Sequence, residues 1–249
     1  MVPRRAWLDD LAWDEQLPGD AVTARRVWTQ TAFSEYASAA AFAAIASALL
    51  ACGAPIELVA AAGDFVIDEL VHVEAAARLA AALGGAVTLD VDLARLVRPV
   101  ATTDALVQAT ELVVRVACVG EAITVPLLKL ARTHAGSPLI ASVLARIVAD
   151  ESGHAQLGWW VLDWASPRLD DAARAHLGAV AGAAVRAFAP TLQSGGATTT
   201  CEPSALGVLG CEVYDPAFAA AVRRHVATPL ACRGIAIPRA DLEAVGVVA

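Results

Sequence analysis

Two short segments of the sequence place a carboxylate and an imidazole one helical turn apart. The segments "DELVH" and "DESGH" share the pattern Asp-Glu-x-x-His. Residues three apart lie on the same face of a helix, so Glu69 with His72, and Glu151 with His154, can converge on one metal ion. Both segments stand among apolar residues, where a buried charge must be paired, neutralised or bound to a metal. The pattern therefore predicts a buried metal site.

A site for two ions needs further carboxylates from neighbouring helices. Glu35 is the only acidic residue in the central part of its segment, and Glu121 stands in "ACVGEAITVP". Glu35 precedes Glu69 by 34 residues, and Glu121 precedes Glu151 by 30. In antiparallel helix pairs of this length, these spacings put all four carboxylates at one level. Glu111 lies ten residues before Glu121 and about 80° off its face, so we expect Glu111 at the surface.

Long helices must carry these residues. Segments rich in Ala, Leu and Val, separated by Gly, Pro and Asp, predict four helices at 21–52, 55–83, 104–134 and 138–164. Short links make the first two helices, and the last two, antiparallel pairs. The segment between the pairs, residues 86–104, is long enough to cross the length of a bundle.

The remaining sequence predicts additional helices beyond this bundle. We expect helices at 170–188 and 215–230, with a loop at 194–204. The predicted fold is therefore all-α. It consists of an N-terminal arm (1–20), a four-helix bundle (21–166) with a long crossover between helices two and three, and a C-terminal helical extension (167–249) packed on the bundle.

The repeated motif, the two further Glu residues and the crossover together resemble the ferritin-like di-iron carboxylate superfamily, in its non-haem oxidase and oxygenase type. The resemblance covers about residues 20–165. It implies six metal ligands: Glu35, Glu69, His72, Glu121, Glu151 and His154. It also implies that Asp68 orients His154 and Asp150 orients His72, each by accepting the non-ligating N–H. Two iron ions are the implied cofactors, with manganese or a mixed manganese–iron pair as alternatives, since zinc prefers fewer carboxylates.

The activity that the resemblance implies is oxidation of a small organic substrate by O2, through a (hydro)peroxo di-iron intermediate. Thr124, three residues after Glu121, is the candidate proton relay, and a threonine that only satisfies a helix carbonyl is the equal alternative. The expected partners are O2, the substrate and an external electron donor. The alternative function is a ferroxidase that handles iron or oxidants without an organic substrate. The single methionine, Met1, and the long C-terminal region count against iron storage.

Composition and charge narrow the function classes further. With 57% hydrophobic residues, the chain must be considered as a membrane protein. Its longest uncharged run, residues 36–56, is rich in Ala and Ser and lacks basic residues close to its ends. These features favour a buried bundle helix over a membrane span. The first twenty residues lack the apolar stretch of a signal peptide, and a net charge of −8 argues against nucleic acid.

The five cysteines are an odd number without a disulfide-framework spacing, which favours a reducing cytoplasm. Cys201 and Cys211 flank a turn-rich stretch and can pair only if the fold brings them close. The C-terminal region has three candidate roles: to cap the bundle, to cover the mouth of the active site, or to form a homodimer interface. We expect the remaining histidines at the surface: His134, His176 and His225.

Overall fold

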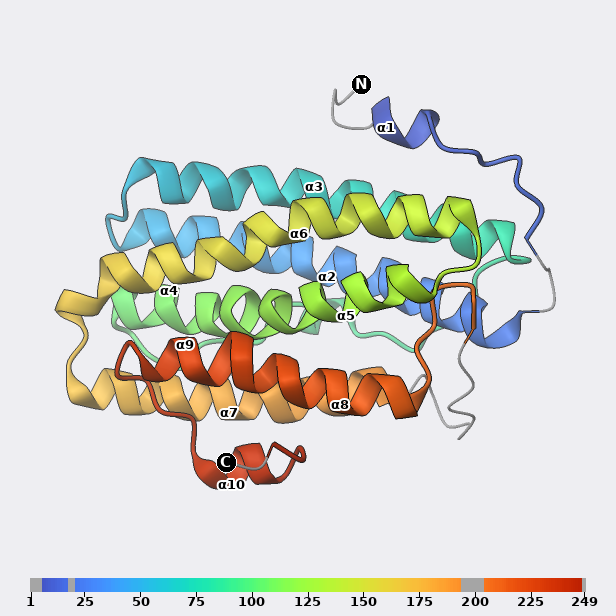
Figure 1. Ribbon diagram of the computed structural model, residues 1–249. Coiled ribbons are helices and arrows are strands. Elements are labelled where there is room, and N and C mark those ends of the chain that lie inside the picture. Colours follow the sequence, from blue (N-terminus) through green and yellow to red (C-terminus); the bar gives the residue numbers. More distant parts are fainter. Residues whose placement is uncertain (1–5, 18–20, 194–203, 248–249) are drawn as a thin grey trace.

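The computed structural model describes residues 6–17, 21–193 and 204–247, and these residues form helices and connecting loops (Figure 1). One isolated β-bridge, between Ser204 and Val208, is the exception within them. The predicted all-α class is confirmed. Three helices run the length of the molecule without interruption: α2 (Val22–Ala51), α3 (Ile56–Ala82) and α6 (Pro138–Ala165).

The predicted third helix consists of three continuous pieces. These are α4 (Ala105–Val113), a π-helical stretch η3 (Val114–Glu121) and α5 (Ala122–His134). Its two ends agree with the sequence prediction, but the π-helical centre was not predicted. In a π-helix the hydrogen bonds run from i to i+5, and such stretches are rare and concentrated at functional sites. The π-helical stretch ends at Glu121.

The long helices form two antiparallel pairs. α3 packs along α2, and α6 packs along η3 and α5. The segment from Leu83 to Asp104, which includes a short 3-10 helix η2 (Leu93–Arg95), connects the two pairs by running the length of the molecule (Figure 1). This is the crossover that the length of the segment predicted.

The C-terminal region forms a further layer of helices beside α4 and α5 (Figure 1). α7 (Asp171–Gln193) lies along η3, and α8 (Cys211–Ala221) lies along α5. The chain continues through η5 (Val222–Ala227) and α9 (Thr228–Ala231) to α10 (Arg239–Glu243), which packs on α7. The helix expected at 215–230 thus begins four residues earlier and contains a π-helical turn.

Local sequence explains where the main helices begin and end. After α2, Gly53 adopts a positive φ of 67°, a conformation that glycine reaches without steric cost. Asp104 begins α4 by accepting a hydrogen bond from the Val107 N–H at 2.9 Å. Ser137 accepts one from the Ile140 N–H at 3.2 Å, with Pro138 in the first turn of α6. Both are standard N-caps.

The N-terminal residues pack on one end of the bundle. The short helix α1 (Ala6–Asp9) carries Leu8, which is fully buried. The Glu15 carboxylate accepts a hydrogen bond from the Leu139 N–H at 2.9 Å, at the start of α6. The ring of Trp13 lies 5.4 Å from the Arg78 guanidinium on α3. These contacts hold the predicted arm against α3 and α6.

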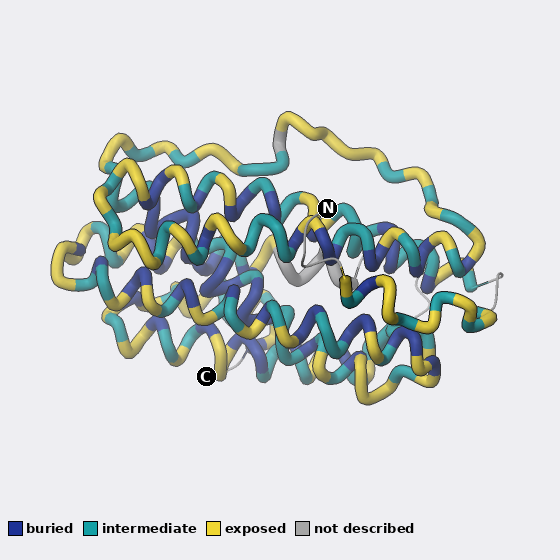
Figure 2. Tube along the Cα trace, turned by 90° about the horizontal axis from the view of Figure 1, so that it is seen from above, coloured by how far each residue is buried: buried dark blue, intermediate teal, exposed yellow. Residues whose placement is uncertain are grey.

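Buried residues line the inner faces of the helices, and exposed residues alternate along the outside (Figure 2). The buried apolar residues form two clusters. Along α2, Trp28 belongs to one cluster and Phe42 to the other; along α6, Ile147 and Leu157 are divided in the same way. Helices α2 and α6 thus each pass from one apolar cluster to the other near the middle of the helix. Glu35, between Trp28 and Phe42, and Glu151, between Ile147 and Leu157, lie at that level.

Helix α2 also has the length and composition of a membrane span. It is the one such helix within the residues described, and 33% of its most apolar window is buried. Its inner face carries Glu35 and packs on α3, α4 and η3.

Candidate metal centre

The four central helices bring the predicted ligands together inside the bundle. Glu35 comes from α2, Glu69 and His72 from α3, Glu121 from the end of η3, and Glu151 and His154 from α6. All six are buried, with exposed fractions between 0% and 8%. Ligand atoms of four of them lie within 4.8 Å of one another: Glu35, Glu69, His72 and Glu151. A buried group of carboxylates and histidine at this spacing can hold a metal ion.

The two Asp-Glu-x-x-His motifs face each other with approximate two-fold symmetry. The Nδ1 atom of His72 lies 3.7 Å from Glu69 and 3.1 Å from Glu151. The Nδ1 atom of His154 lies 3.0 Å from Glu69 and 2.8 Å from Glu151. The central carboxylates of Glu69 and Glu151 therefore each lie near both imidazoles.

The other two carboxylates are each associated with a different histidine. A Glu35 carboxylate oxygen is 3.7 Å from Nδ1 of His72. Glu121 lies beside Glu151 and His154, which together with Glu69 affect its ionisation. The six residues thus divide into two overlapping groups. One group has His72 and Glu35 at its outer side, the other has His154 and Glu121, and both share the central carboxylates.

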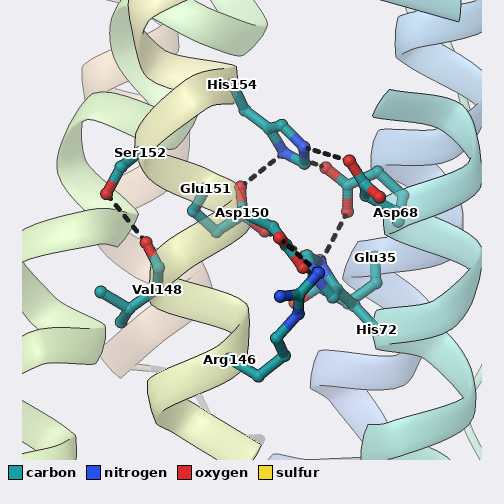
Figure 3. A network of polar contacts seen from close by, with 10 residues as sticks. Glu35, Asp68, His72, Arg146, Val148, Asp150, Glu151, Ser152 and His154 are labelled. Atoms are coloured by element: carbon teal, nitrogen blue, oxygen red, sulfur yellow. Dashed lines mark hydrogen bonds and ion pairs between the residues drawn. The ribbon is translucent and has the colours of Figure 1, made fainter. Parts of the chain in front are cut away.

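The two aspartates contact the outward-facing histidine nitrogens across the helix pair. Nε2 of His72 lies 3.3 Å from Asp150, and Nε2 of His154 lies 3.7 Å from Asp68 (Figure 3). Asp150 is itself paired with Arg146 at 3.0 Å. Because each aspartate meets the nitrogen that points away from the central carboxylates, it can hold the ring so that Nδ1 faces inward.

Several buried polar atoms in this cluster make no well-aligned hydrogen bond, although an imidazole nitrogen or a carboxylate oxygen lies within 3.0–3.7 Å of them. Among the described residues these include both carboxylate oxygens of Glu69, Nδ1 of His72 and Nε2 of His154. A buried polar atom without a partner is costly, so such atoms in a native fold indicate an additional bonding group. A metal ion would satisfy these atoms, and the oxygen-rich set with two imidazoles suits iron or manganese.

Aromatic rings cover one side of the cluster. The ring of His154 lies 4.2 Å from the ring of Phe65 and 5.1 Å from that of Phe42, measured between centroids. Phe42 is fully buried. These rings exclude water from the His154 side and lower the local polarity, which strengthens the electrostatic interactions within the cluster.

The pKa values of three acids of the cluster are shifted, and not all in the same direction. Burial, followed by the charge of Glu69, raises the pKa of Glu35 well above its usual value. Burial, followed by the charges of Glu151 and Glu69, likewise raises the pKa of Glu121. Burial alone would also raise the pKa of Glu151, but hydrogen bonds from His154 and His72 outweigh it, so this pKa lies below its usual value.

Both histidines take up a proton more readily than free imidazole. Burial by itself would lower the pKa of His72, but the neighbouring carboxylates of Asp150 and Glu151 outweigh it and raise the pKa well above its usual value. Burial opposes protonation of His154 too, but the neighbouring carboxylates of Asp68 and Glu151 raise its pKa to about 12. In the metal-free protein, protons thus neutralise the cluster, and a metal must displace them.

The prediction that Glu111 lies at the surface is wrong. Glu111 is 3% exposed and forms an ion pair with Arg115 and a second contact, at 2.7 Å, with Nε2 of His176. The reason is α7, which covers the outer face of α4 and contributes His176. His134, His176 and His225 are exposed, as predicted, but His176 also has this structural role.

Two other predicted residues belong to other features of the fold. Thr124 lines an apolar cavity one turn along α5 from Glu121. Cys211 is disulfide-bonded at the start of α8, and Cys201 lies outside the described residues. Sequence reasoning missed Tyr214, which lines the same cavity as Thr124, because its position in the C-terminal region gave no link to the metal motifs.

The chain matches no protein-family model, no curated protein and no solved structure. The interpretation of the site therefore rests on the residues of this chain alone.

Proposed function

We propose that this protein is a ferritin-like di-iron enzyme, an oxidase or oxygenase that uses O2 to oxidise a small organic substrate. One observation carries the proposal: Glu69 and Glu151 each lie between both histidines, at 2.8 to 3.7 Å from the two Nδ1 atoms. Carboxylates in that position can bridge two ions. In two-metal sites the ions are about 3.5–4 Å apart, and the centroids of the two imidazoles are 6.1 Å apart.

Each residue of the cluster has a definite role in this proposal. His72 and Glu35 would hold one ion, His154 and Glu121 would hold the other, and Glu69 and Glu151 would bridge them. A reduced pair of iron ions supplies the electrons that activate O2. Asp150 holds the His72 ring by its outer nitrogen, at 3.3 Å, and Asp68, at 3.7 Å from the outer nitrogen of His154, would orient the second ring. Phe42 and Phe65 keep water from the His154 side.

The electron balance requires a partner. An oxygenase that inserts one oxygen atom into its substrate reduces the other to water, and this consumes two protons and two electrons from an external donor. An oxidase inserts no oxygen atom. It takes two electrons and two protons from its substrate and reduces O2 to hydrogen peroxide, or four of each and reduces O2 to water. The proposal therefore includes a reductant for the first class and none for the second.

An aerobic Fe(II) titration of the metal-free protein tests the proposal. We expect saturation at about two irons per chain, with O2 consumption that stops near that ratio. Oxidation of iron far beyond it would favour the ferroxidase alternative, and absence of binding would contradict a metal site. The variants Glu121→Ala and Glu151→Ala should abolish turnover and reduce iron binding; unchanged iron content in Glu151→Ala would overturn the assignment.

A further inference from the structure

An apolar cavity of about 160 Å³ lies between α2, α5, α6 and the segment 207–209, and it is partly open to solvent. Two of its lining residues are close neighbours of the metal cluster along the chain. Thr31 precedes Glu35 by one helical turn on α2, and Thr124 follows Glu121 by one turn on α5. One turn advances a helix by about 5.4 Å. The cavity therefore lies within reach of the metal centre.

The C-terminal region closes the end of this cavity. The indole N–H of Trp28 donates a hydrogen bond to the Leu206 carbonyl at 2.9 Å. Gly207, at a φ of +88°, packs so closely that an added Cβ would lie 3.0 Å from Trp28 and 3.1 Å from Ile140. These contacts fix the segment 207–209 against α2 and α6.

One residue that lines the cavity has a buried hydroxyl without a hydrogen-bond partner. Tyr214, from the first turn of α8, lines the cavity and is 9% exposed. Its hydroxyl makes no hydrogen bond with any described residue. Burial, and then the charge of Asp215, raises the pKa of Tyr214, so the hydroxyl keeps its proton. It is therefore a buried hydrogen-bond donor that a ligand would satisfy.

The remaining lining restricts the chemistry of that ligand. Aliphatic side chains such as Leu127, Leu144 and Ile147 dominate it, and no charged side chain is among the described residues that line it. A charged ligand group would be buried there without a counter-charge, at a high cost in free energy. In size, the cavity is close to an apolar cavity of about 150 Å³ that holds one benzene molecule.

We propose that this cavity is the substrate site, and that the substrate is a small, neutral, mainly apolar molecule with one oxygen that accepts a hydrogen bond from Tyr214. The assignment of the ligand as substrate rests on the proposed function. The binding itself does not, because it can be measured without metal. Tyr214 holds the oxygen at the C-terminal end of the cavity, and the apolar part of the molecule extends towards Thr31 and Thr124.

A pair of ligands of equal shape tests the role of Tyr214. Acetophenone carries a carbonyl oxygen where α-methylstyrene carries a methylene group, so the two differ in the hydrogen-bond acceptor. Calorimetric titration of both ligands into the wild type and Tyr214→Phe gives a ratio of dissociation constants for each protein. We expect the preference for acetophenone to fall by about 2- to 10-fold in Tyr214→Phe. An unchanged ratio would overturn the role of Tyr214.

Two further variants keep the test specific. Tyr36 is the only other tyrosine and is 44% exposed, so Tyr36→Phe should leave the ratio unchanged. Ala131 lines the cavity on α5, ten residues beyond Glu121. Ala131→Phe should fill the cavity and abolish binding of both ligands while the protein still binds iron. Binding that survives Ala131→Phe would place the ligand elsewhere.

The two proposals fail in different ways. Iron binding at about two ions per chain without ligand binding in the millimolar range would contradict the substrate site and leave the metal centre standing. Ligand binding that depends on Tyr214, in a protein that takes up no iron, would support the cavity as a binding site and contradict the di-iron function.

Discussion

Glu69 and Glu151 differ from the other two carboxylates of the cluster because they contact both histidines. Glu35 approaches only the His72 imidazole, and Glu121 lies beside His154. The central carboxylates would therefore serve both metal positions, and the outer carboxylates would serve one each. Substitution of a central carboxylate should therefore change the number of bound ions differently from substitution of an outer carboxylate.

We predict that Glu69→Gln and Glu35→Gln have unequal effects on iron. Glutamine keeps the size of the side chain but removes the charge that a bridging ligand needs. Glu69→Gln should lose both ions, whereas Glu35→Gln should retain about one per chain, because the ligands around His154 remain. Anaerobic Fe(II) titration with counting of bound iron measures this. Glu74→Gln, five residues along α3 from Glu69 and paired with Arg78, is the matched control and should bind as the wild type does. Equal losses in the first two variants would contradict the bridging arrangement.

The contact between Asp150 and His72 makes a separate prediction. Asp150→Asn removes the charge that holds Nε2 of His72, so the inward Nδ1 becomes a weaker and less well-oriented ligand. Loss of such a supporting carboxylate typically lowers metal affinity by about 10- to 100-fold. We expect this loss for one ion of the pair. The complementary variant Asp68→Asn should weaken the other ion, next to His154, and a double variant should weaken both. Wild-type affinity in both single variants would show that these contacts do not support the ligands.

For single elements, the sequence predicts where a helix ends better than which of its faces another helix buries. The Gly, Pro and Asp breaks correctly predicted the ends of α2, α3, α5 and α6 within a few residues, because backbone conformation at these positions is a local property. The π-helical stretch that ends at Glu121 was missed because its side-chain pattern is read at the α-helical period. Glu111 was misplaced for a different reason. Its burial depends on α7, which lies 60 residues later in the chain.

Two glycines make a matched prediction about helix packing. Gly158 on α6 faces η3, and an added Cβ would lie 2.7 Å from the Sγ of Cys118 and 3.0 Å from Ala117. Gly158→Ala should therefore destabilise the protein by about 1–3 kcal/mol through overpacking. Gly63 on α3 is exposed with open space around it, so Gly63→Ala should stabilise by about 0.5–1 kcal/mol through helix propensity. Urea denaturation of both variants measures the changes. Equal effects of the two substitutions would contradict the close approach of α6 and η3.

For the whole molecule, the predictable part of the site is the part repeated in the sequence. Both Asp-Glu-x-x-His motifs, with Glu35 and Glu121, come together because long helices of similar length bring them to one level of the bundle. The cavity beside this level could not be predicted in the same way. Its lining combines α2, α5 and α6 with Gly207 and Tyr214, and only the folded arrangement of residues 204–214 brings these together.

The ionisation of the cluster connects this site to the stability of the whole chain. The pKa values of Glu35, Glu121, His72 and His154 are raised in the fold. A group with a raised pKa contributes stability that is fully present below its unfolded pKa and is lost as the pH rises through the folded value. Unfolded values are about 4.3 for Glu and about 6.5 for His. The lowered pKa of Glu151 acts in the opposite direction, but only in acid.

We therefore predict that the metal-free protein loses thermal stability as the pH rises from about 6 to about 8. Stabilisation by Fe(II) should grow over the same range, because metal ligation requires deprotonated ligands. Anaerobic thermal unfolding at several pH values, with and without Fe(II), measures both trends. In the double variant Glu35→Gln with Glu121→Gln, two of the raised groups are absent, so the metal-free curve should be flatter than that of the wild type. This comparison separates the cluster from every other titrating group in the chain. A wild-type curve that rises with pH, or that coincides in shape with the double variant, would show that protons do not occupy the site in the absence of metal.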